Sequence, residues 1–186
     1  MDSEEYRDYR MLDAFNTIRT LLGEPRHPEL KTKKYDDELL QMKPSDGLKT
    51  VIQHPVESLP HPAVTPEVTE EMKQQIHLWI IRLKDCVYAL ERSEFGDKLE
   101  NGKIKHTNLT GGEPAFTGGE LIWITEREVI VNGCSGRYGP KNANEMTTAA
   151  KAFSNSGYRT WTTGYDEGTG YCFRFGASIP VEALPQ

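Results

Sequence analysis

Polar, potentially reactive side chains gather between residues 105 and 157, where short apolar runs alternate with glycine-rich turns. His106 has a side chain that can exchange a proton near neutral pH. Glu120 follows two glycines and leads into an apolar run, so its carboxylate is expected to be half-buried, with a raised pKa and a catalytic use. The alternatives are a histidine bonded to a backbone carbonyl and an exposed glutamate that pairs with Arg137 or Lys141.

A turn rich in glycine and hydroxyl groups follows at residues 133–140 and opens into an expected helix. Backbone amides at a helix start, with Arg137 and Lys141 beside them, would form a cradle for an anion or phosphate. Ser135 and Tyr138 would add hydroxyl donors. The alternative is an ordinary strand-to-helix turn in which Ser135 is a cap and Tyr138 packs in the core.

Cys134 lies between Gly133 and Ser135, just before the expected helix. A thiol in that position could have a depressed pKa and act as a nucleophile, with His106 as its base. Cysteine is also a common small buried residue, which is the competing interpretation.

Aromatic residues cluster near the C-terminus and alternate along two expected strands. They could line a cleft for a base or a nicotinamide ring, although alternation is also typical of a core with one amphipathic face. The cluster consists of Tyr158, Trp161, Tyr165, Tyr171, Phe173 and Phe175.

Composition excludes several classes of protein. The formal net charge is −6 and the sequence pI is near 5.4, which argues against nucleic acid as the main partner. No apolar run has the roughly 20 residues that a membrane helix needs. The three cysteines are widely spaced and form no CxxC pair, so neither a disulfide framework nor a zinc site is expected. A cytoplasmic protein with reduced thiols fits best, or one delivered into the cytoplasm of a target cell.

The elements expected to position these residues change in type near residue 100. Before it, apolar spacing predicts helices over 3–22 and from Pro66 to about Arg92, joined by a proline-rich loop with one helical turn at 36–42. After it, alternation predicts strands, with a hairpin at Glu126-Arg127, one helix over 141–156, and a further hairpin. The strands are expected at 103–109, 119–125, 128–133, 158–163 and 170–176.

This pattern predicts an α+β protein in which N-terminal helices pack on a small, mainly antiparallel sheet with one inserted helix. We expect a helical segment over residues 1–100, with its proline-rich loop, and a glycine-rich effector-like domain over residues 101–186. Thirteen of the 16 glycines lie in the second segment, and the whole net charge lies in the first.

Residues 103–160 resemble the C-terminal effector modules of bacterial polymorphic toxins and Rhs-type proteins, and related phage or stand-alone proteins. The resemblance rests on His-Thr-Asn-Leu, Gly-Gly-Glu-Pro-Ala, Gly-Glu-Leu and Asn-x-x-Ser-Gly-Arg-Tyr-x-Pro, followed by a helix. It implies that five positions matter: His106, Glu120, Asn132, Ser135 and Tyr138. The chain departs from the pattern at Asn108, where family members often have a small hydroxyl residue, and at Arg137, where they often have histidine.

Together these observations predict an effector-like enzyme acting on a nucleotide or phosphate-bearing substrate. Transfer of ADP-ribose from NAD is one concrete version of this prediction. Its catalytic residues would be His106, Glu120 and Ser135, without a metal. Substrate binding is assigned to four residues: Asn132, Arg137, Tyr138 and Lys141. The alternative is a non-enzymatic inhibitor, immunity-type or counter-defence protein that sequesters a ligand or blocks a host protein complex.

Overall fold

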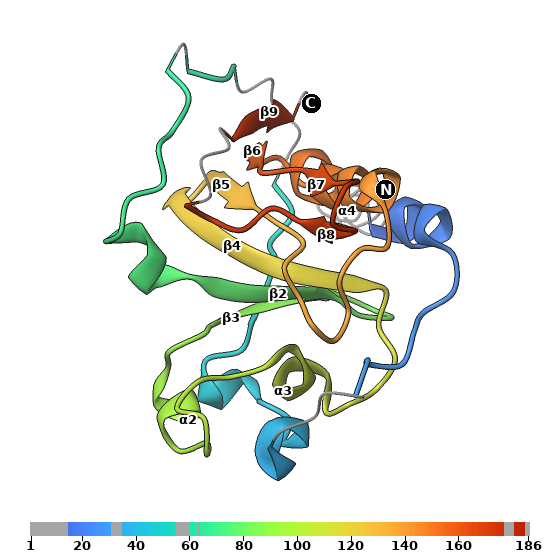
Figure 1. Cartoon of the computed structure of the whole chain (residues 1–186), viewed down its shortest axis with the longest axis vertical. Coiled ribbons are helices and arrows are strands. Elements are labelled where there is room, and N and C mark those ends of the chain that lie inside the picture. The colour runs from blue at the N-terminus through green and yellow to red at the C-terminus, as the bar shows by residue number, and fades with distance from the viewer. Residues whose placement is uncertain (1–14, 31–34, 55–59, 63, 177–180, 185–186) are drawn as a thin grey trace, which may run out of the picture.

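A seven-stranded mixed sheet forms the centre of the computed structural model, which describes residues 15–30, 35–54, 60–62, 64–176 and 181–184 (Figure 1). The strand order is β1-β3-β2-β4-β5-β6-β9. The strands are β1 (Lys49–Thr50), β2 (His77–Ile81), β3 (Cys86–Leu90), β4 (Thr117–Thr125), β5 (Glu128–Val131), β6 (Arg159–Thr162) and β9 (Glu182–Leu184). All neighbouring strands are antiparallel except β5 and β6, which are parallel.

Short helices and one long helix cover the two faces of this sheet (Figure 1). They are the 3-10 helices η1 (Asp36–Leu39), η2 (Pro44–Asp46) and η3 (Met72–Gln75), and the α-helices α2 (Glu94–Asp97), α3 (His106–Thr110) and α4 (Ala143–Asn155). A further helix occupies residues 15–22. Strands β7 (Tyr165–Asp166) and β8 (Tyr171–Cys172) form a separate two-stranded sheet.

The predicted fold class is therefore wrong, because the sheet is large and mixed and the helices are not an N-terminal layer on a small sheet. The main error lies at residues 66–92, where one long helix was expected. The chain forms η3 there and then the antiparallel hairpin of β2 and β3. The predicted division near residue 100 falls between α2 and α3, and strands from both sides of it pair in the one sheet.

The hairpin was mistaken for a helix because β2 is buried on both faces. Leu78 and Ile80 pack on one face while Trp79 and Ile81 pack on the other. A strand covered on both sides is a continuous apolar run, and such a run also satisfies three- and four-residue helical spacing. The turn that reverses the chain is polar: the backbone N–H of Arg82 donates to the carbonyl of Asp85, 2.9 Å away.

Two further predictions about local structure are wrong. Residues 103–109 were expected to form a strand, but His106–Thr110 is a helix whose start is fixed by a 2.8 Å bond from the Lys105 N–H to the Asn108 side-chain oxygen. Segments 158–163 and 170–176 were expected to pair as one hairpin. Instead β6 pairs with β5 and β9, and only the short strands β7 and β8 form the hairpin.

Other expectations are confirmed. Strands β4 and β5 form the predicted hairpin, and α4 buries the expected apolar face before the chain turns at Gly157, whose φ is 85°. Residues 15–22 are helical and Gly23 has a φ of 83°, as the predicted helix end requires, while residues 3–14 of that prediction lie outside the described residues. The helical turn expected at 36–42 is η1.

Three apolar clusters cover the sheet, one on the first face and two on the opposite face. The largest packs beneath α4 and the helix over 15–22. On the opposite face one cluster lies beneath α3, and another contains Ile122 of β4 together with Phe175 and, from the η3 region, Met72. The opposite face is thus covered in two separate parts, and the boundary between them crosses β4.

Candidate functional site

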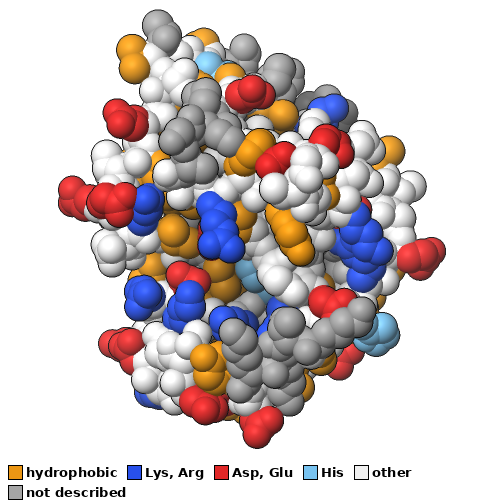
Figure 2. All heavy atoms as spheres, in the orientation of Figure 1, with side chains coloured by type: hydrophobic (Ala, Val, Ile, Leu, Met, Phe, Trp, Pro, Cys, Tyr) orange, Lys and Arg blue, Asp and Glu red, His pale blue; other side chains and the backbone are white. Residues whose placement is uncertain are grey.

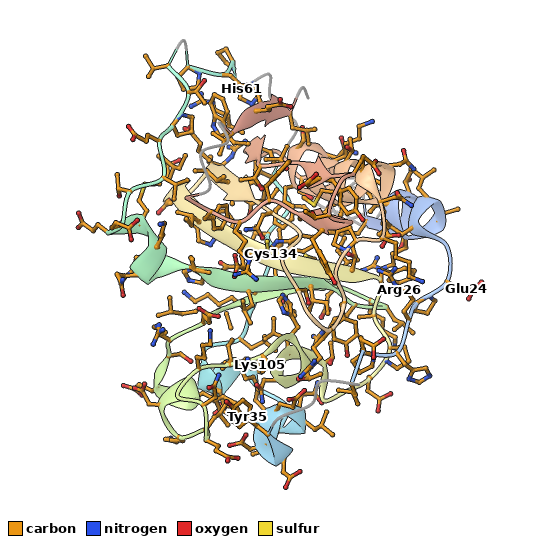
Figure 3. All side chains as sticks on the ribbon, in the orientation of Figure 1. Glu24, Arg26, Tyr35, His61, Lys105 and Cys134 are labelled. Atoms are coloured by element: carbon orange, nitrogen blue, oxygen red, sulfur yellow. The ribbon has the colours of Figure 1, made fainter. Side chains whose placement is uncertain are left out.

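Glu120 lies on β4 and is half-buried. It lies on the sheet face that carries two apolar clusters, between the cluster beneath α3 and the cluster that contains Ile122. It pairs in register with Leu78 of β2, whose side chain belongs to the cluster beneath α3. Figure 2 shows a hollow in the middle of the viewed face, where acidic, basic and hydrophobic side chains meet. In Figure 3, Cys134 lies at the centre of this face and Lys105 and Tyr35 lie below it.

The Glu120 carboxyl is fixed by Asn132, which follows β5 and is fully buried. The Asn132 side-chain N–H donates to Oε2 of Glu120 at 3.0 Å, and its oxygen accepts the backbone N–H groups of Glu120 at 3.0 Å and Cys134 at 2.9 Å. Beneath them, the indole N–H of Trp79 donates to the carbonyls of both Glu120 and Asn132. The carboxyl is therefore held in one position, with Oε1 making no hydrogen bond to the described residues.

Burial raises the pKa of Glu120 above its ordinary value, and the nearby Glu91 carboxylate adds to this. The hydrogen bond from Asn132 and the charges of Lys103 and Arg174 act in the opposite direction and lower the pKa. A raised pKa in a half-buried carboxyl is a property expected of a group that transfers protons. The sequence prediction of a half-buried carboxyl at this position is confirmed.

Lys103 and Arg174 lie near enough to the carboxyl to lower its pKa, Lys105 lies two residues after Lys103, and sequence reasoning selected none of the three. Lys103 forms a 3.4 Å ion pair with Glu91 and lies near enough to Glu120 to lower its pKa. The ammonium of Lys105 lies 5.8 Å from the Tyr35 ring centroid, and Arg174 is exposed after β8. Within the described part of the chain, neither Lys105 nor Arg174 has a carboxylate ion-pair partner. The signal in the sequence that could have indicated two of these cations is Lys103 and Lys105, within the three residues before His106.

His106 lies close to Glu120 but its ring has a structural partner. Its Nε2 is 2.8 Å from the carbonyl oxygen of Gly119, and the side chain is 5% exposed. Burial lowers the pKa of His106 to about 4, so the ring is neutral at pH 7 and its Nε2–H donates to that carbonyl. The histidine thus secures the backbone next to Glu120, which matches the structural alternative rather than a proton-transfer group at the surface of the hollow.

Gly118 and Gly119 are required for this arrangement. A Cβ on Gly118 would lie 2.6 Å from the Trp79 carbonyl and 3.0 Å from the His106 ring. A Cβ on Gly119 would overlap the carbonyl oxygen of Asn132. The two glycines let the backbone of β4 approach Trp79 of β2 and Asn132 closely.

Cys134 does not have the properties of a nucleophile. Burial raises the pKa of its thiol to about 12, the opposite of the predicted depression. The sulfur lies 3.5 Å from the carbonyl oxygen of Phe173 and 3.6 Å from that of Cys172, which places the thiol as a donor to backbone. Because the thiolate is the reactive form, the hypothesis of a Cys134–His106 pair is wrong.

The turn after Cys134 uses its hydroxyl groups internally. Oγ of Ser135 accepts the backbone N–H groups of Arg137 at 3.3 Å and Tyr138 at 3.0 Å. The Tyr138 hydroxyl donates to the carbonyl of Glu113 at 2.8 Å and lies 2.8 Å from Oγ1 of Thr110. Ser135 therefore acts as a cap and Tyr138 as a core residue, which is the alternative that the sequence left open.

The Arg137 guanidinium is buried in an ion pair with Glu38 of η1. Its Nε lies 2.7 Å from one carboxylate oxygen of Glu38 and an Nη lies 3.1 Å from the other, while a second Nη donates to the Glu29 carbonyl. Lys141 is exposed, and its carbonyl accepts the Tyr165 hydroxyl beside β7. Of the seven selected residues, Glu120 and Asn132 are joined by a hydrogen bond between their side chains.

Comparison of the chain with protein-family models, curated proteins and solved structures finds no match. Within the described residues, no group of three or more histidine, cysteine, aspartate or glutamate side chains is arranged to hold a metal ion. No helix in that part of the chain has the length and apolar character needed to cross a membrane.

Proposed function

We propose that the hollow beside Glu120 binds a phosphate-bearing small molecule of the nucleotide class, and that Glu120 exchanges a proton with it. The protein would act as an effector-like enzyme in a bacterial or phage setting, in the cytoplasm of its own or a target cell. The resemblance of residues 103–160 to effector modules supports that setting.

The observation that carries the proposal is the state of the Glu120 carboxyl. One oxygen is bonded to a fully buried amide, the pKa is raised by burial, and the other oxygen has no hydrogen-bond partner among the described residues. Oε1 is not among the buried atoms left without a partner in the described residues, so solvent or a bound molecule can reach it. A fixed carboxyl with one unused oxygen is suited to donate or accept a proton from a bound molecule.

The surroundings match the two parts of a nucleotide. Lys105 and Arg174 offer positive charge without a carboxylate partner in the described part of the chain, which suits a phosphate group. On the other side, Met72 and Ile76 are partly buried hydrophobic side chains packed on the cluster that contains Phe175. Such an apolar wall suits the flat face of a base.

Binding and turnover can be tested separately with AMP, NAD, ADP-ribose and inorganic phosphate. Thermal shift and calorimetry would measure binding, and chromatography would measure conversion. We expect at least one nucleotide to raise the melting temperature, and Glu120→Gln to bind it with similar affinity while conversion falls by about 100-fold. Glu126→Gln, a change in the exposed β4–β5 turn, is the matched control. The absence of any nucleotide-induced shift would contradict the proposal.

A second candidate is supported by how the other selected residues are used. His106, Ser135 and Tyr138 make internal hydrogen bonds, and Arg137 is ion-paired to Glu38. A single proton-transfer group with no second reactive partner among these residues also suits a protein that sequesters the same ligand without converting it. Tight nucleotide binding with no product, unchanged in Glu120→Gln, would favour this candidate.

A further inference from the structure

A second carboxylate, that of Glu91, lies on the same face of the sheet as Glu120. Glu120 is opposite Leu78, and Leu78 is opposite Ala89 of β3. Glu91 comes two residues after Ala89, and its backbone N–H continues the ladder by donating to the Ile76 carbonyl at 3.0 Å. Because side chains alternate along a strand, Ala89 and Glu91 face the same side. Both carboxylates therefore project from the same face of the sheet.

The two carboxyl groups have different environments, although the charge of Lys103 acts on both. The Glu91 carboxylate is ion-paired with Lys103 at 3.4 Å, and its side chain is 17% exposed. Glu120 is bonded to the neutral amide of Asn132, and its pKa is raised by burial and by Glu91 itself. A carboxylate held by an ion pair, beside a carboxyl held by a neutral amide, can divide the roles of base and acid.

We propose that Glu91 is the catalytic partner of Glu120 and that the pair hydrolyses the N-glycosidic bond between the base and the ribose of a nucleotide. This inference rests on the proposed function, since it requires a nucleotide in the same hollow. Glu120 is the acid, Glu91 is the base, and Lys103 orients the Glu91 carboxylate through the 3.4 Å ion pair. Glu91 touches the attacking water, whereas Lys103 is a positioning residue.

The step is balanced with water as the only co-reactant. The C–N bond breaks with its electron pair moving to the base, and Glu120 gives that nitrogen a proton. A water oxygen bonds to the ribose carbon and transfers a proton to Glu91. The products are the free base and ribose phosphate, with no change in oxidation state.

Charge distribution favours this reaction over attack on the phosphate. In glycoside cleavage the ribose carbon becomes positively charged, and two neighbouring carboxyls stabilise that charge. The same carboxyls would repel the negative charge that surrounds a phosphoryl group. Lys105 and Arg174, which have no carboxylate partner in the described structure, would hold the phosphate at the edge of the hollow.

AMP is a suitable probe, because adenine must be protonated to leave. Adenine release would be followed by chromatography in water enriched in oxygen-18, and the ribose 5-phosphate product would be weighed by mass spectrometry. We expect wild-type protein to release adenine and to place one heavy oxygen in the sugar product. Glu91→Gln should lower the rate by about 100-fold and change AMP affinity by less than about threefold. Glu91→Asp, which keeps the charge, should retain more activity than Glu91→Gln, and Glu126→Gln should equal wild type.

The outcomes separate the two proposals. AMP binding without adenine release by wild-type protein would overturn the hydrolysis inference and leave the proposed ligand site intact. Unaltered turnover in folded Glu91→Gln would overturn the role of Glu91. If Glu91→Gln does not fold, the comparison of Glu91→Asp with wild type decides, because equal rates for these two would overturn it as well. Failure to bind any nucleotide would remove the proposed function itself.

Discussion

The turn over residues 134–140 and the hollow beside Glu120 are neighbours, yet they use polar side chains in opposite ways. In the turn, hydroxyl and guanidinium groups are bonded to backbone or to a buried carboxylate. At Glu120, by contrast, a fixed carboxyl keeps one oxygen without a hydrogen bond to the described residues, and the cations Lys105 and Arg174 lack carboxylate ion-pair partners in that part of the chain. On the proposed account, the turn is a scaffold and ligand chemistry belongs to the surface that it supports.

The largest effect should come from breaking the scaffold at Arg137. Arg137→Met leaves the Glu38 carboxylate buried without its guanidinium partner, which should lower the free energy of unfolding by about 3–5 kcal/mol. Urea denaturation followed by tryptophan fluorescence would measure it. The double variant Arg137→Met, Glu38→Leu should recover much of the loss, because an apolar pair does not leave a buried charge. Equal instability of the single and double variants would contradict this account of the pair.

The pH dependence of stability should identify His106 as part of the scaffold. Its folded-state pKa is about 4 and its ordinary value is 6.5, so between these values the unfolded chain binds more protons. The contribution of His106 to stability is therefore complete above pH 6.5 and is lost as the pH falls to 4. The loss is on the order of 3 kcal/mol.

His106→Asn is the comparison for that measurement. Urea denaturation between pH 4 and 7 should give a flatter stability profile for the variant, because the titrating ring has been removed. Identical profiles for the two proteins would show that the ring is not held neutral by burial. Other titrating groups contribute equally to both profiles and cancel in the difference.

The elements that frame this comparison were predictable to different degrees. Helix α4 follows from helical spacing on an element with one covered face, whereas the β4–β5 hairpin, which is covered on both faces, was indicated by two short apolar runs on either side of Glu126-Arg127. The β2–β3 hairpin was not predicted, because Leu78 and Trp79 are buried on opposite faces and the alternation disappears. Burial on both faces depends on tertiary packing, so the periodicity of a short apolar run cannot distinguish such a strand from a buried helix.

The site was predictable only in part for a related reason. The position of Glu120 after two glycines correctly indicated a half-buried carboxyl. Glu91, however, was assigned to a helix that does not exist, and its place beside Glu120 depends on the order β3-β2-β4. Arg137 was interpreted as an anion-binding group because its partner, Glu38, lies 99 residues away in the chain. Partnerships of this kind are set by the fold.

A smaller effect is expected at the edge of the hollow. Lys105→Ala should weaken AMP binding by about tenfold, the usual value of one charged hydrogen bond to phosphate, and leave stability almost unchanged. Calorimetry would measure the affinity, with Lys151→Ala on the exposed side of α4 as the control. Equal affinities of the two variants for AMP would show that Lys105 does not bind the phosphate, and would contradict the assignment of ligand binding to the hollow.

The smallest effect should be that of Glu120→Gln on stability. The folded-state pKa of Glu120 is raised, so ionisation of its carboxyl at neutral pH opposes folding. The stabilisation contributed by the protonated carboxyl is lost as the pH rises through the folded-state pKa. An amide in the same place should therefore change the unfolding free energy at pH 7 by less than about 1 kcal/mol, in the stabilising direction. Thermal melting at pH 7 would measure it, and a large destabilisation would show that Glu120 belongs to the scaffold.

A crystal structure with AMP tests most directly whether the ligand site is the hollow rather than the turn. The account predicts the phosphate beside Lys105 and Arg174, with the ribose against the Glu120 carboxyl. Phosphate density bound instead by the backbone amides of residues 135–141, with the hollow unoccupied, would contradict it.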